Sequence, residues 1–198
     1  CTCSYPLPTA MSLVAMPESY EQWSSWGESE LASGTIQRIG LNFGAPGDRI
    51  TQSGTLWLDF PSVGGPSPKI DVVTRPAKLD YRYRHSLWMK NDELYPWVTA
   101  SAVEGLEQVA LKNLKPGRYT VRLYFAEPDD VAVGARVQTI KLQGEERLVA
   151  LDVLAETSTP MTGLVREFND IAVDGEFTVD LSAAQGRTLV SGIELIRR

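Results

Sequence analysis

Tyr119-Thr-Val-Arg-Leu-Tyr-Phe-Ala-Glu127 places Val121, Leu123 and Phe125 at every second position, which is the period of a β-strand with one buried face. Three further stretches of strand composition follow it: Leu164-Val-Arg-Glu-Phe168, Val173-Asp-Gly-Glu-Phe-Thr-Val179 and Ser191-Gly-Ile-Glu-Leu-Ile196. Short segments of this kind, separated by turn residues, are typical of antiparallel sheets. The last third of the chain therefore predicts a series of strands.

Strand patterns also occur outside these stretches. In the first half we expect strands at Gln37–Phe43, Thr55–Phe60 and Lys78–Arg84. In the second half we expect them at Gln108–Leu111, Arg118–Ala126, Val137–Leu142, Glu146–Leu151, Val165–Ile171, Phe177–Leu181 and Thr188–Ile196. Turn signals separate the later strands at Lys115-Pro-Gly117, Gly144, Asp174-Gly175 and Gly186. No apolar period of 3.6 persists over three turns, so we predict an all-β, antiparallel β-sandwich or jelly roll with little helix.

The composition limits the size and the class of the protein. The chain has 198 residues, 43% of them hydrophobic and 22% charged, which suits one globular core. We expect residues 1–30 to be an N-terminal tail or linker at the end of a preceding domain, and residues 31–198 to form the sandwich. The net charge of −6 disfavours nucleic acid and anionic membranes as partners. Cys1 and Cys3 lie too close in sequence to bridge each other, so no disulfide framework is expected.

Two segments near the start of the sandwich resemble the opening of malectin-like domains. Ile39-Gly-Leu-Asn-Phe-Gly44 has the hydrophobic-Asn-hydrophobic-Gly strand of that family, and Ser53-Gly-Thr-Leu-Trp-Leu-Asp59 has its glycine, tryptophan and aspartate. The strands between Tyr119 and Ile196 follow in the order of the family. The resemblance implies a galactose-binding-like β-sandwich and a carbohydrate-binding role.

A second resemblance concerns the surroundings of the domain. The segment Gly54–Pro68 and the start Cys1-Thr-Cys-Ser-Tyr5 look like the C-terminal region of planctomycete-type proteins, in which a pyrroloquinoline-quinone-type β-propeller precedes this module. The chain departs from the malectin pattern at Val137–Ile140 and Ala155–Pro160, and it has an insertion around Arg75–Trp97. These departures affect the loops that contact ligand more than the frame of the fold.

The candidate sugar-binding residues lie in Tyr81–Trp97. Sugar binding needs flat aromatic faces for the apolar side of the pyranose ring and polar side chains for its hydroxyl groups. The stacking candidates are Tyr83, Trp88, Tyr95 and Trp97, with Tyr81 beside them. The hydrogen-bond candidates are Arg84, His85, Asn91 and Asp92. The structural alternative is that Tyr81 and Tyr83 share a strand face in the core, and that Trp97 packs under Ala100 and Val103.

Several other residues have two interpretations. Trp57 stands between apolar neighbours on a strand, which predicts a core position, and Asp59 is expected to hold the loop at Pro61. Glu127 is a secondary ligand candidate, because the loop after its strand lies near the ligand end of malectin-like domains. Asp129 and Asp130 could supply oxygens to a structural Ca²⁺ ion, although a solvated acidic loop is the alternative.

The sequence gives little support to catalysis. His85 is the single histidine and no Gly-x-Ser-x-Gly motif is present, which disfavours a Ser-His-Asp triad. Zinc sites need ligand spacings that His85 and two N-terminal cysteines do not provide. No pair of carboxylates stands out for glycoside hydrolysis. We therefore expect no enzyme and no cofactor.

Two hypotheses of function follow. The first is a non-catalytic carbohydrate-binding module of a larger, exported multidomain protein, located in the periplasm or secreted. The second is a structural or docking domain that packs against a β-propeller and binds no sugar. The first predicts that the aromatic side chains line a common site, and the second predicts that they are buried or form an apolar patch.

Overall fold

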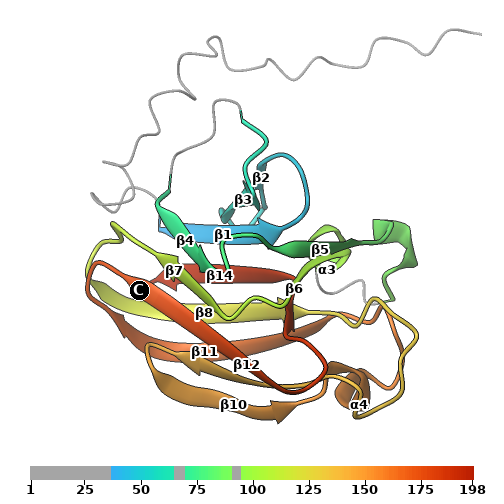
Figure 1. Cartoon of the computed structure of the whole chain (residues 1–198). Coiled ribbons are helices and arrows are strands. Elements are labelled where there is room, and N and C mark those ends of the chain that lie inside the picture. The colour runs from blue at the N-terminus through green and yellow to red at the C-terminus, as the bar shows by residue number, and fades with distance from the viewer. Residues whose placement is uncertain (1–36, 65–69, 91–94) are drawn as a thin grey trace, which may run out of the picture.

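The computed structural model describes residues 37–64, 70–90 and 95–198, and these form two main sheets that face each other (Figure 1). The first sheet has six strands in the order β11 (Leu164–Val173), β8 (Gly117–Phe125), β14 (Gly192–Arg197), β1 (Arg38–Phe43), β3 (Leu56–Phe60) and β2 (Arg49–Ile50). The second has five strands in the order β10 (Glu145–Leu151), β9 (Val137–Leu142), β12 (Phe177–Gln185), β7 (Gln108–Leu111) and β4 (Val72–Arg75). A small third sheet contains β13 (Leu189–Val190), β6 (Ser101–Glu104) and β5 (Asp80–Tyr83). In the described part of the chain, every strand pair is antiparallel except β1 with β3.

Helical structure is limited to short segments in the described residues. These are the 3₁₀ turn η1 (Ser86–Trp88) and the helices α3 (Pro96–Thr99) and α4 (Val153–Thr157). None of the described helices is long and apolar enough to cross a bilayer. The prediction of an all-β antiparallel sandwich with little helix is confirmed.

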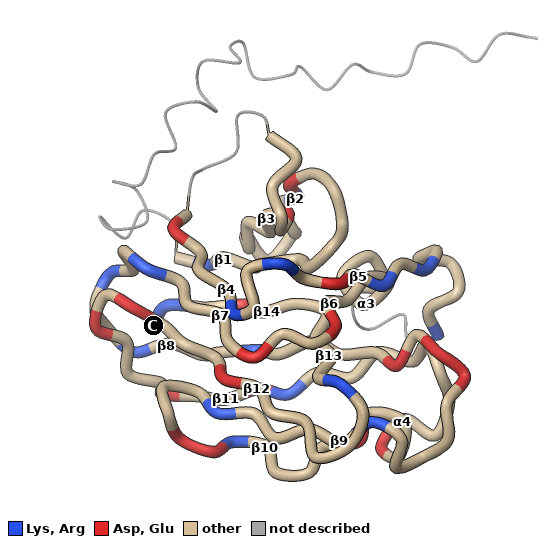
Figure 2. The backbone as a smooth tube through the Cα atoms, viewed as in Figure 1, with Lys and Arg blue, Asp and Glu red and all other residues tan. Residues whose placement is uncertain are grey.

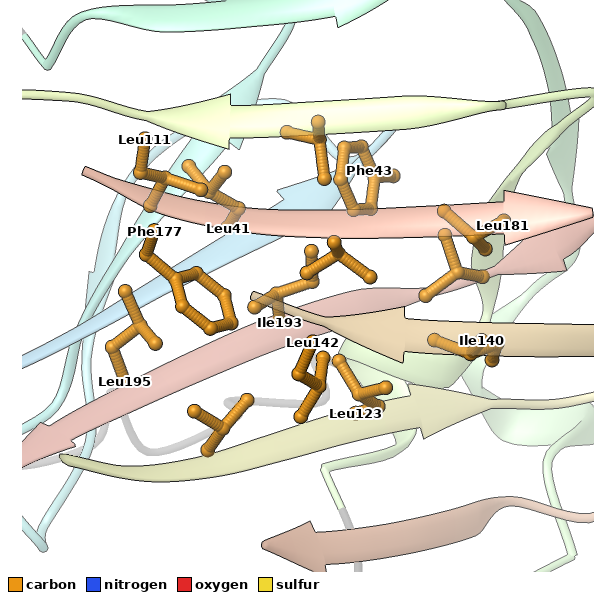
Figure 3. Packing of buried hydrophobic residues seen from close by; sticks show 14 of the residues in the cluster. Leu41, Phe43, Leu111, Leu123, Ile140, Leu142, Phe177, Leu181, Ile193 and Leu195 are labelled. Carbon is orange, nitrogen blue, oxygen red and sulfur yellow. The ribbon is translucent and has the colours of Figure 1, made fainter. Parts of the chain in front are cut away.

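The hydrophobic core lies between the two main sheets, where side chains of alternate strand positions meet (Figure 3). From the six-stranded sheet it receives Leu41, Phe43, Leu123, Ile193 and Leu195. From the five-stranded sheet it receives Leu111, Ile140, Leu142, Phe177 and Leu181. Each of these side chains is at least 96% buried, so the space between the sheets is a closely packed apolar core.

The predicted turn at Gly144 joins β9 to β10. Gln143 and Gly144 have φ angles of 51° and 80°, as the tightest antiparallel hairpin connections require. Glycine adopts this backbone without steric cost, which explains why the hairpin reverses here.

The structure divides one predicted strand. The region Thr188–Ile196 forms β13 and β14, which belong to different sheets: β13 pairs with β6, and β14 pairs with β1 and β8. Strands β7 and β9 have the predicted bounds, whereas β2, β4 and β6 were not predicted. Ser101–Glu104 is buried at all four positions, so it lacks the alternation by which exposed strands are recognised.

Candidate functional site

The candidate aromatic residues fall into separate groups. Tyr81 and Tyr83 share one face of β5, and their ring centroids are 6.4 Å apart. Tyr81 is partly buried against the core, and burial raises the pKa of its hydroxyl to about 12, with a further contribution from Tyr83. Tyr83 is 57% exposed. The alternative that both tyrosines lie in the core is therefore confirmed in part for Tyr81 and is wrong for Tyr83.

Trp88 is presented to solvent by η1. The Nδ1 atom of His85 accepts a hydrogen bond from the backbone N–H of Leu87 at 3.2 Å and so caps this short turn. Leu87 is 85% exposed and Trp88 is 60% exposed. The next residue, Met89, is buried with Ala100, Ala126 and Met161. The exposed pair is thus carried on a turn whose following residue is fixed in a small core.

Tyr95 and Trp97 belong to a different aromatic cluster. Their ring centroids are 5.4 Å apart, and Trp97 lies edge-on to Trp57 at 5.6 Å. Tyr95 also contacts Trp57 and stacks on Tyr124 at 6.2 Å. The structure therefore brings Tyr95 and Trp97 together in a packed, half-buried cluster.

Two contacts reduce the free surface of that cluster. The guanidinium of Arg49 lies 5.1 Å from the ring centroid of Trp97, and the hydroxyl of Tyr95 hydrogen-bonds Ser53 Oγ at 3.3 Å. Trp97 packs on Trp57 and not under Ala100 and Val103 as the structural alternative had it. A ligand at this cluster would have to compete with Arg49 for the face of Trp97.

Trp57 and Asp59 have the structural roles expected of them. Trp57 is 1% exposed, as predicted, but it lies on the outward face of the six-stranded sheet and not in the central core. Its Nε1 atom has no hydrogen-bond partner within the described part of the chain. The carboxylate of Asp59 accepts hydrogen bonds from the backbone N–H groups of Gly47 and Val63, both at 3.2 Å. It thereby holds the loop at Pro61.

The acidic loop after β8 is tied to arginine side chains. Glu127 Oε2 accepts a hydrogen bond from Arg136 Nε at 2.9 Å, and Asp129 Oδ1 accepts one from Arg84 Nη2 at 2.7 Å. Burial raises the pKa of Glu127 above its usual value, although the charge of Arg136 opposes the rise. Figure 2 shows basic positions on β5 and acidic positions on the loop after β8 at the same end of the sandwich. Glu127 is buried inside this network, where it supports the loop.

The metal candidates lie at the same place. Asp129 also lies within 4 Å of Arg82 and Arg136, whereas Asp130 is exposed. Among the described residues no group of three or more His, Cys, Asp or Glu side chains could hold a metal ion. The structural Ca²⁺ ion stays a prediction, which a comparison of thermal unfolding with and without a chelator would test. Asn91 and Asp92 lie outside the described residues.

Sequence reasoning missed the network that supports this end of the molecule. Arg136 joins Glu104 on β6 to Glu127 on the loop after β8, with N–O distances of 2.9 Å to each. Arg82 adds a hydrogen bond to Glu104 at 2.7 Å. The alternation of Arg82 on β5 with Arg84 directly after this strand was a visible signal, but their partners are distant in sequence and only the fold identifies them.

Comparisons with known proteins found similarity in the fold and not in the sequence. No protein-family model matches the chain, and no curated protein matches it. Among solved structures, the extracellular domain of ANXUR1 from Arabidopsis thaliana superposes with a TM-score of 0.62 at 14% identity, over 80% of this chain and 47% of that one. The fold is malectin-like.

Other structures share this malectin-like fold to a similar degree. A β-glucuronidase of Bacteroides uniformis has a TM-score of 0.64 at 15% identity, over 87% of this chain and 19% of the enzyme. A complex of the plant peptide RALF23 with FER and LLG2 contains a chain with a TM-score of 0.54 at 18% identity, over 80% of this chain and 48% of that one. The chain thus spans about a fifth of the glucuronidase and about half of the plant proteins. At these identities the likeness concerns the fold alone.

Proposed function

We propose that this malectin-like domain is a non-catalytic carbohydrate-binding module of a larger, exported protein. The observation that carries the proposal is the exposure of two aromatic side chains, Tyr83 and Trp88, near the strand ends of a rigid sandwich. Each is followed directly by a residue with fixed contacts. Arg84, after Tyr83, is hydrogen-bonded to Asp129, and Met89, after Trp88, is packed in a small buried cluster. An aromatic face held in place can stack on the C–H face of a pyranose ring with little loss of side-chain freedom.

The polar groups near these rings suit sugar hydroxyls. Arg84 donates to the carbonyl oxygens of Tyr83 and Pro128 as well as to Asp129, so its side chain is oriented before any ligand arrives. His85 and Lys90 flank the exposed turn and can add donors or acceptors. Such a surface supplies apolar contact from the rings and selectivity from the polar groups.

The test is a glycan array followed by calorimetric titration of the best oligosaccharide. Trp88→Ala should weaken binding at least about tenfold, on the order of 1.4 kcal/mol, because the stacking face is lost. Leu87→Ala removes a neighbouring exposed apolar side chain that has no aromatic face, and it should leave sugar binding unchanged. Absence of binding to a broad panel of oligosaccharides would reject the proposal.

The second candidate function is docking to another protein domain, such as a β-propeller in the parent protein. The observation that favours it is the exposure of Leu87 beside Trp88, since two large apolar side chains on one turn form a contact that a protein partner could cover. This function predicts that Leu87→Ala and Trp88→Ala weaken association with the partner to a similar degree. The same pair of variants therefore separates the two functions.

A further inference from the structure

A pocket of about 600 Å³ lies where β7 separates from β12, and its lining includes none of the candidate aromatic residues. Strand β7 pairs with β12 only as far as Gln108 opposite Asp180, whereas β12 continues to Gln185 along β9. The departure of β7 leaves Leu181, Ser182 and Ala183 as one wall of the pocket. Figure 1 shows β4, β7 and β12 side by side on this part of the molecule.

Backbone hydrogen bonds fix the rim of the pocket. Leu181 donates its N–H to the carbonyl of Glu107, and Glu107 donates its own N–H to the carbonyl of Arg75, both at 2.8 Å. On the other side, Gly105 donates to the carbonyl of Thr188 at 2.8 Å. The walls therefore come from four separate parts of the chain that are bonded to one another. The pocket is preformed, which reduces the cost of binding.

Two guanidinium groups border the pocket. Arg187 is oriented by Asp80 at 2.8 Å and by Glu104 at 3.2 Å. Arg75 gives its Nε to Glu107 at 3.2 Å, and its terminal nitrogens have no hydrogen-bond partner in the part of the chain that the structure describes. Glu107 is the one carboxylate among the lining residues, and the charge of Arg187 is balanced by Asp80 and Glu104 beside it, so Arg75 has the freer guanidinium of the two.

The remaining lining is suited to a hydroxylated carbon frame. Pro76, Leu181 and Ala183 offer apolar surface, and Ser182 and Glu107 can bond hydroxyl groups. The volume is within the range of ordinary small-molecule sites, and it exceeds what a bare inorganic anion needs. A ligand that satisfies all of these groups has a carboxylate for the arginines, hydroxyls for Ser182 and Glu107, and a C–H face.

We propose that this pocket binds a small hydroxylated carboxylate of the size of a hexuronic acid. The terminal nitrogens of Arg75 would bind its carboxylate, with Arg187 as the second charged donor of the lining. The pocket is separate from Tyr83 and Trp88. Binding of a carboxylate in it does not depend on sugar binding by these aromatic residues, so the proposal goes beyond the proposed function.

The experiment is a ¹H–¹⁵N NMR titration of the full chain with sodium glucuronate. Saturable shifts of the amide signals of Ser182 and Ala183 at millimolar ligand are expected. Glucose lacks the carboxylate, acetate lacks the hydroxyls and inorganic phosphate lacks the carbon frame, so each should bind at least about tenfold more weakly. Failure of glucuronate to produce saturable shifts, or equal binding of any of the three comparison ligands, would overturn the proposal.

Two variants locate the ligand. Arg75→Gln should weaken glucuronate binding at least about tenfold, and Ala183→Trp should abolish it by filling the pocket. Val149→Trp places the same side chain at an exposed position of β10 and should have no effect. If Ala183→Trp does not fold, Arg75→Gln decides alone, because Arg75 is 63% exposed and its replacement leaves the core intact.

The same titration distinguishes this proposal from the carbohydrate module. Trp88→Ala should leave glucuronate binding unchanged. Loss of glucuronate binding in Trp88→Ala with retention in Arg75→Gln would reject the pocket and support the aromatic site. The opposite pattern would support the pocket.

Discussion

Trp57 is buried on the outward face of a sheet because two glycines make room for its indole ring. Gly40 on β1 and Gly192 on β14 lie beneath the ring, and a Cβ at Gly192 would be 3.0 Å from Cζ3 of Trp57. Tyr124 packs edge-on to the indole with a centroid distance of 5.2 Å. The absence of two side chains on adjacent strands is therefore what allows a tryptophan to lie across the sheet.

Gly40→Ala should destabilise the protein by about 1–3 kcal/mol. A Cβ at Gly40 would fall inside contact distance of the indole of Trp57, so the ring or the strand would have to shift. Urea denaturation monitored by tryptophan fluorescence measures the change.

Gly117→Ala is the matched control for this substitution, since it adds the same methyl group to a strand glycine. Its Cβ would be 3.3 Å from the flexible side chain of Arg197, and the expected change is less than about 1 kcal/mol. Equal losses in the two variants would contradict the packing explanation for Trp57.

At the scale of elements, ion pairs connect the third sheet to the loop after β8 and to the residue before β9. Arg136 precedes β9 and reaches Glu104 on β6 and Glu127 after β8. Arg187 links the same Glu104 to Asp80 on β5. Glu104 is therefore the point at which the third sheet, the end of β8 and the start of β9 are held together.

Glu104→Gln should lower stability at neutral pH by on the order of 2 kcal/mol, because three arginines lose their shared charged partner. Burial alone would raise the pKa of Glu104, but hydrogen bonds and charges from Arg136 and Arg82 hold it below 4.5. An acid with a lowered pKa in the folded state adds stability above 4.5, and this stability is lost as the pH falls through the folded-state value.

The stability difference between the wild type and Glu104→Gln should therefore shrink below about pH 4.5. Urea denaturation at a series of pH values gives this difference directly. Glu145→Gln breaks an exposed pair with Arg147 and should change stability little at any pH. A difference for Glu104→Gln that stays constant from neutral to acid pH would contradict the role of its charge.

The sequence predicted strands best where one face is buried and the turns are marked. Strand β9 shows strict alternation between buried and half-buried positions, and its bounds were predicted correctly. The division of Thr188–Ile196 at Ser191 could not be predicted, because both parts have strand composition and only their partners differ.

The candidate site was predictable in its residue types and not in its grouping. One segment contains Tyr83, Trp88, Tyr95 and Trp97, but only the last two come together, over Trp57 and Tyr124. Which aromatic side chains come together depends on Trp57 on β3 and Tyr124 on β8, and these strands are distant in sequence from the segment. A pattern within the segment therefore cannot predict which of its residues meet. The pocket beside β12 was missed for the same reason, since its lining comes from four separate parts of the chain.

At the scale of the whole molecule, the sandwich separates stability from binding. The core lies between the two main sheets, whereas the exposed aromatic residues and the pocket are at the ends and gaps of strands. Acidic and basic residues are interspersed along the strands of the described part of the chain, as Figure 2 shows. Loops of such a fold can change without disturbing the core, and the proposed binding surfaces lie on these parts.

The whole-molecule prediction is that a fragment of residues 31–198 unfolds within about 2 °C of the full chain. The described core begins at Ile39 on β1, and β1 pairs with β14, which covers residues Gly192–Arg197. A fragment that begins at Gly44 should not fold, because it lacks β1, which pairs with β14 and β3 and carries Leu41 and Phe43 into the core. Thermal unfolding followed by circular dichroism compares the three chains. If the fragment of residues 31–198 unfolds more than about 5 °C below the full chain, residues 1–30 contribute to the stability of the domain, and the predicted boundary is wrong.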